Sequence, residues 1–89
     1  NMFPRELDGA EVLFYTDKAD FGELEEEGKE ARAIAYLAIA QKPGDPACYL
    51  MLCDADYCVI ADHSFPAVEW CKTMAGMRYP DIVWHEMGK

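Results

Sequence analysis

The segment 48–63 constrains the fold of this chain more than any other. It contains two β-prone runs, 48–53 and 58–63, on either side of the polar turn 54–57. Both runs are apolar on both of their faces, which a sheet with one solvated side does not need. A chain of 89 residues has few elements with which to cover two faces. We therefore expect one face of this hairpin to meet a partner surface, first of all that of a second copy.

The polar turn also predicts which side chains of the hairpin share a face. With a four-residue loop at 54–57, Cys53 lies opposite Cys58 and Tyr49 lies opposite Asp62. One face then carries Tyr49, Met51, Cys53, Cys58, Ile60 and Asp62. The other carries Cys48, Leu50, Leu52, Val59, Ala61 and His63.

Two earlier segments also read as strands. Residues 10–16 are β-branched and aromatic, as in a strand. Residues 31–41 are rich in alanine and leucine, which favours a helix. However, the strong turn signal at 42–46 leads directly from this segment into the clear strand at 48–53. We therefore predict a strand over 31–41, with a helix as the alternative.

A helix is expected after the hairpin, with Ser64 as its N-cap and Gly76 as its stop. Its apolar stripe at helical spacing consists of Ala67, Val68, Cys71, Met74 and Ala75. This stripe is expected to pack on the hairpin face that carries Leu50 and Leu52. Residues 81–87 read as a last short strand, and Pro80 suits its first position.

These elements predict an α+β fold in a single domain over residues 1–89. The sheet is an antiparallel meander of four or five strands, with one main helix packed on one face. The runs Tyr49–Asp54 and Val59–Asp62, Ser64 opening a helix and the isolated Trp84 resemble a class of small uncharacterised bacterial α+β proteins of unknown function. The resemblance covers about residues 31–87 and carries over no functional residue.

The net charge of −9 limits the partners of the chain. Residues 17–30 carry seven acids against two lysines. Nucleic acids and anionic membranes require lysine and arginine to neutralise phosphate, so neither is an expected partner. A basic protein partner remains compatible with this charge. No apolar run approaches the roughly 20 residues of a membrane span, and no signal-peptide pattern is present, so we expect a cytoplasmic location.

The four cysteines are expected to be reduced, and Cys53 and Cys58 give the alternative reading of the chain. Directly opposed thiols could form a labile disulfide, or bind a metal together with ligands from elsewhere. The five-residue spacing of Cys53, Cys58 and His63 is wider than zinc sites prefer, and His63 lies on the opposite face. Buried apolar cysteines are the simpler interpretation, and no cofactor is expected.

No motif of the chain indicates catalysis, so we expect a non-enzymatic protein that acts through protein–protein contacts. The expected interface lies on the sheet face away from the helix and consists of Tyr36, Tyr49, Met51, Ile60 and Trp84. A homodimer is the first interpretation, and inhibition of a basic nuclease or toxin is a second. In the competing interpretation, the N-terminal segment, with Phe3, Leu7, Leu13 and Phe21, folds over that face and completes an ordinary core.

Overall fold

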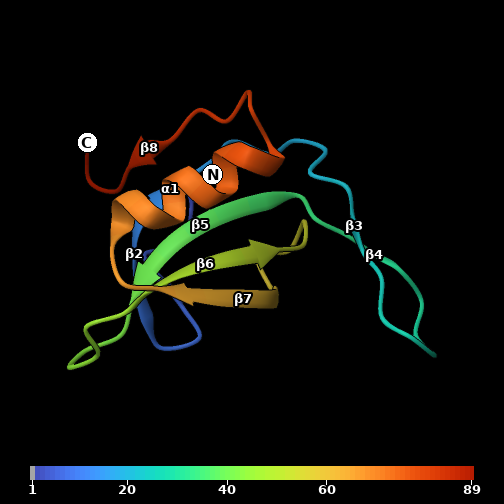
Figure 1. The fold of residues 1–89 in the computed structure, drawn as a ribbon, viewed down its shortest axis with the longest axis horizontal. Coiled ribbons are helices and arrows are strands. Elements are labelled where there is room, and N and C mark those ends of the chain that lie inside the picture. Colours follow the sequence, from blue (N-terminus) through green and yellow to red (C-terminus); the bar gives the residue numbers. More distant parts are fainter. Residues whose placement is uncertain (1) are drawn as a thin grey trace.

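The computed structural model describes residues 2–89, which form a curled antiparallel sheet, a small two-stranded sheet and one α-helix (Figure 1). The main sheet has the order β1-β2-β5-β6-β7, and β8 also pairs with β2. Its strands are β1 (Glu6–Leu7), β2 (Ala10–Tyr15), β5 (Tyr36–Gln41), β6 (Cys48–Cys53), β7 (Val59–Phe65) and β8 (His85–Glu86). The α+β class with an antiparallel sheet is confirmed. The sheet has six strands rather than four or five, because β1 was not predicted.

The strand predicted over 31–41 is confirmed for its second half, which forms β5. The first half contributes β4 (Arg32–Ala33), which pairs with β3 (Glu23–Leu24) in the small sheet. Ala38 and Ala40 are fully buried between β2 and β6, where tertiary packing overrides the weak strand propensity of alanine. The chain therefore leaves the main sheet after β2, forms the β3–β4 arm and returns as β5 (Figure 1).

The predicted register of the β6–β7 hairpin is wrong for two reasons: the turn shifts β7 by one residue, so that Cys53 does not pair with Cys58, and a β-bulge shifts it by one more. Cys53 pairs with Val59, and Leu52 pairs with Ala61, so Ile60 is an extra residue on β7. Beyond the bulge, Met51 pairs with Asp62 and Leu50 pairs with His63. The shift at the turn exchanges the faces of Val59 and Ile60, and the bulge returns the residues after Ile60 to their predicted faces. Ile60 packs against the cluster on the helix side, and Val59 packs against the cluster on the other side.

The helix α1 (Val68–Arg78) begins later and ends later than predicted. Ser64 is not its N-cap, because β7 continues through Ser64 to Phe65. The N-cap is Ala67, which makes no side-chain capping bond. Gly76 does not stop the helix, which ends at Arg78 with the Tyr79 N–H bonded to the Ala75 carbonyl. The strand predicted over 81–87 shrinks to the two residues of β8.

Both faces of the central strands are buried. On the helix side, Cys71 and Ala75 of α1 belong to one cluster with Leu50 and Leu52, as predicted. On the other side, Phe3 and Leu7 cover Met51, so the competing interpretation of the N-terminal segment is confirmed for these two residues. Phe21 lies instead in the helix-side cluster. Within residues 2–89, no helix is long and apolar enough to span a membrane.

Truncation of Met51 tests this second buried face. Its side chain is 0% exposed, so Met51→Ala leaves a cavity and is expected to lower the free energy of unfolding by about 2–5 kcal/mol. Val83→Ala is the control, because Val83 is 65% exposed and its truncation should cost no more than about 0.5 kcal/mol. Urea denaturation measures both. Equal, small losses would show that the N-terminal segment does not pack on Met51.

Candidate functional site

The five residues of the predicted interface do not form one surface. Tyr36, Tyr49 and Met51 lie on the face away from the helix, whereas Ile60 and Trp84 pack against the helix-side cluster. Met51 is fully buried, and the Tyr36 ring stacks on Tyr57 with 4.7 Å between centroids. The placement of Ile60 and Trp84 on the far face is therefore wrong. For Ile60, the physical cause is the register shift at the turn, which pairs Cys53 with Val59.

Cys53 and Cys58 are not the opposed pair that the sequence indicates. Cys53 lies opposite Val59 and is buried, and burial raises the pKa of its thiol to about 12. Cys58 is exposed, with its Sγ atom 4.0 Å from the Asp56 carbonyl oxygen. All four cysteines are free thiols. Within residues 2–89, no three His, Cys, Asp or Glu side chains gather as metal ligands.

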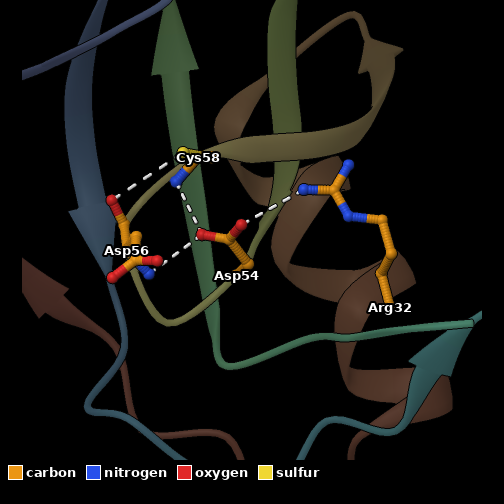
Figure 2. Close-up of polar contacts among 4 residues, drawn as sticks. All are labelled: Arg32, Asp54, Asp56 and Cys58. Atoms are coloured by element: carbon orange, nitrogen blue, oxygen red, sulfur yellow. Dashed lines mark hydrogen bonds and ion pairs between the residues drawn. The ribbon is translucent and has the colours of Figure 1, made fainter.

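The turn between β6 and β7 is organised by Asp54, as Figure 2 shows. Its Oδ1 atom accepts hydrogen bonds from the backbone N–H groups of Asp56 and Cys58, both at 2.9 Å. Its Oδ2 atom accepts one from Arg32 Nη2 at 3.2 Å. The hydrogen bond from the Cys58 N–H lowers the pKa of Asp54 below its ordinary value. The bonds from the Asp56 N–H and from the Arg32 side chain act in the same direction. Aspartates in turns commonly bond nearby backbone N–H groups in this way, and the role of Asp54 is structural.

The two edges of the main sheet differ. The outer edge of β2 is covered along its length, by β1 at Glu11 and Ala10 and by β8 at Phe14 and Tyr15. In contrast, β7 pairs with β6 alone among the strands of residues 2–89 and forms the margin of the sheet (Figure 1). A seven-residue strand with one unpaired edge is a template for pairing with another chain.

The hydrogen-bond pattern predicts which groups of β7 are free. Leu37 of β5 forms two hydrogen bonds with Thr16. The Thr16 N–H donates to the Leu37 carbonyl oxygen (3.0 Å), and the Leu37 N–H donates to Thr16 Oγ1 (3.1 Å). Leu52 of β6, which pairs with Leu37, therefore directs its own N–H and C=O groups toward β7. Leu50 and Cys48, which alternate with Leu52 along β6, do the same. Their partners on β7 include His63 and Phe65. The intervening Asp62 and Ser64 thus direct their N–H and C=O groups away from the sheet.

An exposed apolar stripe on α1 lies beside this open edge. It consists of Trp70, Met74 and Met77, which are 53%, 39% and 75% exposed. Lys72 lies on the opposite side of the helix, with its Nζ atom 3.8 Å from the ring of Phe14 in β2. Met74 is about half a helical turn away from Lys72 and lines a hollow with His63 and Phe65 of β7. The stripe therefore faces β7.

The hollow between β7 and α1 has a volume of about 250 Å³. Its floor is apolar, and its rim carries the guanidinium of Arg78 and the imidazole of His63. Its lining is Leu50, Leu52, His63, Phe65, Met74, Ala75, Arg78 and Tyr79. Together with the open edge of β7 and the stripe, it forms a continuous surface, which we call the β7–α1 groove.

A larger hollow of about 780 Å³ lies on the β2 edge. Backbone groups there are already bonded, because Val12 N–H donates to Arg5 O and Met87 N–H donates to Leu13 O, both at 2.9 Å. This hollow has no open strand edge, so the β7–α1 groove is the better candidate for binding another chain.

The β7–α1 groove was not predicted from the sequence. Met74 was predicted in the buried stripe of the helix, and no prediction concerned Trp70 or Met77. The spacing of these three residues by four and then three positions was the available signal, because it places them on one face of a helix. The open edge had no sequence signal, because it depends on the strand order of the sheet.

Acidic side chains dominate the exposed surface of the β3–β4 arm, which extends away from the main sheet (Figure 1). Its two cations are already in ion pairs, Lys29 with Glu26 at 3.5 Å and Arg32 with Asp54 at 3.2 Å. The other acids of the arm are exposed, and they are Glu23, Glu25, Glu27 and Glu30. The arm therefore presents negative charge to any partner.

Comparisons with protein-family models, with curated proteins and with solved structures find no match to this chain. The contacts and charges of the chain itself therefore carry the functional argument.

The exposure of the thiols predicts their reactivity. Cys58 is expected to react with a thiol reagent such as DTNB much faster than the other three cysteines, which are buried. Burial also raises the pKa values of Cys53 and Cys71, to about 12 and about 11, so thiolate is scarce at both. The native reaction should therefore show one fast thiol, which Cys58→Ser removes. Two fast thiols in the wild type would contradict the burial of Cys53.

The Asp54 contacts predict a dependence of stability on pH. Because the folded state lowers the pKa of Asp54, ionised Asp54 stabilises the fold above its ordinary pKa of 3.8. This contribution is lost as the pH falls through the folded-state pKa. Asp54→Asn should lower the free energy of unfolding near neutral pH by no more than about 1 kcal/mol, since Asp54 is half-buried in a surface turn and solvent screens its charge.

The control for this prediction is Asp56→Asn, because the carboxylate of Asp56 belongs to the same turn and makes none of these bonds. The difference in unfolding free energy between wild type and Asp54→Asn should shrink at acidic pH. A difference that stays constant from neutral to acidic pH would show that the charge of Asp54 does not stabilise the turn.

Proposed function

We propose that this chain is a non-catalytic binding module that acts through protein–protein contacts and recognises a basic protein partner through the β7–α1 groove. One observation carries the proposal: the open edge of β7 lies beside the exposed stripe of Trp70, Met74 and Met77. Tryptophan and methionine are enriched at protein interfaces, and an unpaired edge supplies backbone hydrogen bonds to a bound chain.

The negative charge of the chain favours a partner with positive net charge. The chain carries −9 in total, and its acidic β3–β4 arm has no unpaired cation among the residues that the structure describes. A basic partner is attracted over a long range by this field, which raises the rate of association. One concrete form is inhibition of a basic nuclease or toxin by charge complementarity. Such binding should weaken as the ionic strength rises.

A homodimer was the first interpretation of the sequence, and it depended on the sheet face away from the helix. Phe3 and Leu7 pack on that face within one chain, so it supplies less apolar surface for a second copy. Two copies of charge −9 also repel each other. These observations favour a different protein as the partner.

The alternative of a thiol-based metal or redox module receives no support from the geometry. Cys53 lies in the buried cluster on one sheet face, whereas Cys58 lies in the exposed turn. A reactive thiol pair needs both sulfur atoms accessible and within bonding reach. Cys53 and Cys58 are better explained as a core residue and a turn residue.

The proposal is tested by affinity capture with paired variants. Immobilised wild-type chain should retain one or a few basic proteins in stoichiometric amount, and Met77→Glu should lose them, because it places a charge in the stripe. Val83→Glu is the matched control, since Val83 is 65% exposed and lies outside the β7–α1 groove. Retained proteins should elute with increasing salt. Identical capture by Met77→Glu and Val83→Glu would contradict the proposal, as would acidic proteins that elute independently of salt.

A further inference from the structure

We infer that the partner segment bound in the β7–α1 groove is an extended strand in which apolar and basic side chains alternate, and that it adds to the open edge of β7. This inference rests on the proposed function and specifies the chemistry of its partner. Its elements are the outward backbone groups of β7, the apolar side of the groove and the exposed carboxylate of Asp62.

Backbone groups provide the first part of the recognition. Asp62 and Ser64 direct N–H and C=O groups away from β6, and both residues are exposed. No element of residues 2–89 other than β6 pairs with β7. An added strand satisfies these groups with main-chain hydrogen bonds, which give affinity without requiring a particular sequence.

Side chains on the helix side of an added strand meet an apolar surface. Residues placed opposite His63 and Phe65 point to this side, because cross-strand partners share a face. There they lie over the hollow that Met74, Leu50 and Leu52 line, beside the exposed Trp70 of the stripe. The hollow of about 250 Å³ suits one or two aliphatic side chains rather than a large ligand.

Side chains on the other side of the added strand meet a negative charge. Asp62 pairs with Met51 and lies on the face away from the helix, exposed and without an ion-pair partner among the described residues. A lysine or arginine directly opposite Asp62 gains a favourable cross-strand pair. Since successive residues of a strand alternate between faces, the recognised pattern is apolar, basic, apolar.

A second copy of this chain fits the groove less well than such a segment. In a dimer with a two-fold axis perpendicular to the sheet, the β7 strands of the two copies pair symmetrically about that axis. An axis that passes between the two Asp62 residues places their carboxylates directly opposite each other. The middle of β7 contributes Asp62, His63 and Ser64 and has neither lysine nor arginine. Charge complementarity therefore assigns the groove to a basic segment of another protein.

The experiment uses synthetic peptides of the length of β7, seven residues, with blocked ends and alternating lysine and leucine. Titration calorimetry measures their affinity for the whole chain. The control peptides are a leucine–glutamate alternation and a block peptide that has all its lysines before all its leucines. We expect the lysine–leucine alternation to bind on the order of tenfold more tightly than either control.

Two N-methylated versions of the alternating peptide test strand addition itself. Methylation of every second amide removes the hydrogen bonds toward β7 in one version and leaves them intact in the other. Only one of the two should therefore lose affinity. Equal affinity of both versions and the unmodified peptide would overturn strand addition, because the side chains alone would then explain binding.

Variants of the chain test the assigned positions. Asp62→Lys should invert the preference, so that the leucine–glutamate peptide binds more tightly than the lysine–leucine peptide. Asp62 is exposed, so this change should leave the fold intact. Met74→Glu should weaken both peptides, whereas Val83→Glu should weaken neither. An unchanged preference in Asp62→Lys would overturn the assignment of the basic side chain to Asp62.

The outcomes separate this inference from the proposed function. If no peptide binds while Met77→Glu still abolishes capture of a basic protein, strand addition is overturned and the protein-binding function stands. If light scattering shows a dimer that Ser64→Pro splits, the occupant of the groove is a second copy and the inference is overturned. Ser64→Pro removes only an outward N–H group, so it is not expected to break the pairing of β7 with β6.

Discussion

The structure depends on the burial of both faces of the β5–β6 pair. Leu37, Ile39 and Leu50 need cover on one face, and Ala38 and Met51 need it on the other. One amphipathic helix can cover only one face of a sheet. The chain uses α1 for the first face and its N-terminal segment, with Phe3 and Leu7, for the second. The alanines of β5 follow from this arrangement, because small side chains allow the covering segment to lie close to the sheet.

The same constraint explains why one edge of the sheet is closed and the other is open. The segments that cover the second face also contribute β1, and the chain end after α1 contributes β8, so both short strands pair with β2. Within residues 2–89, β6 is the only strand that pairs with β7. The helix that covers the first face turns Trp70 and Met74 toward this edge rather than into the core. The open edge of β7 and the exposed side chains of α1 beside it therefore follow from how a small chain distributes its few elements.

The β-prone runs and the polar turn of 48–63 were sufficient to predict the two central strands, and the turn signal at 42–46 identified the alanine-rich β5 as a strand. The exact register had no signal in the sequence. Asp54 accepts bonds from the N–H groups of Asp56 and Cys58, β7 starts only at Val59, and the bulge at Ile60 shifts the pairing once more. Ser64 suggested a helix N-cap on local chemistry alone, yet pairing with Tyr49 keeps it in β7.

The sequence by itself determined the α+β class, the central hairpin, the helix on the Leu50–Leu52 face and the acidic character of the surface. These properties follow from local side-chain periodicity and from charge, which need no knowledge of distant contacts. Only the tertiary structure decided which segment covers the second face, which cysteines are accessible and which strand edge stays open. These depend on the strand order β1-β2-β5-β6-β7, and strand order arises from contacts between residues far apart in the chain.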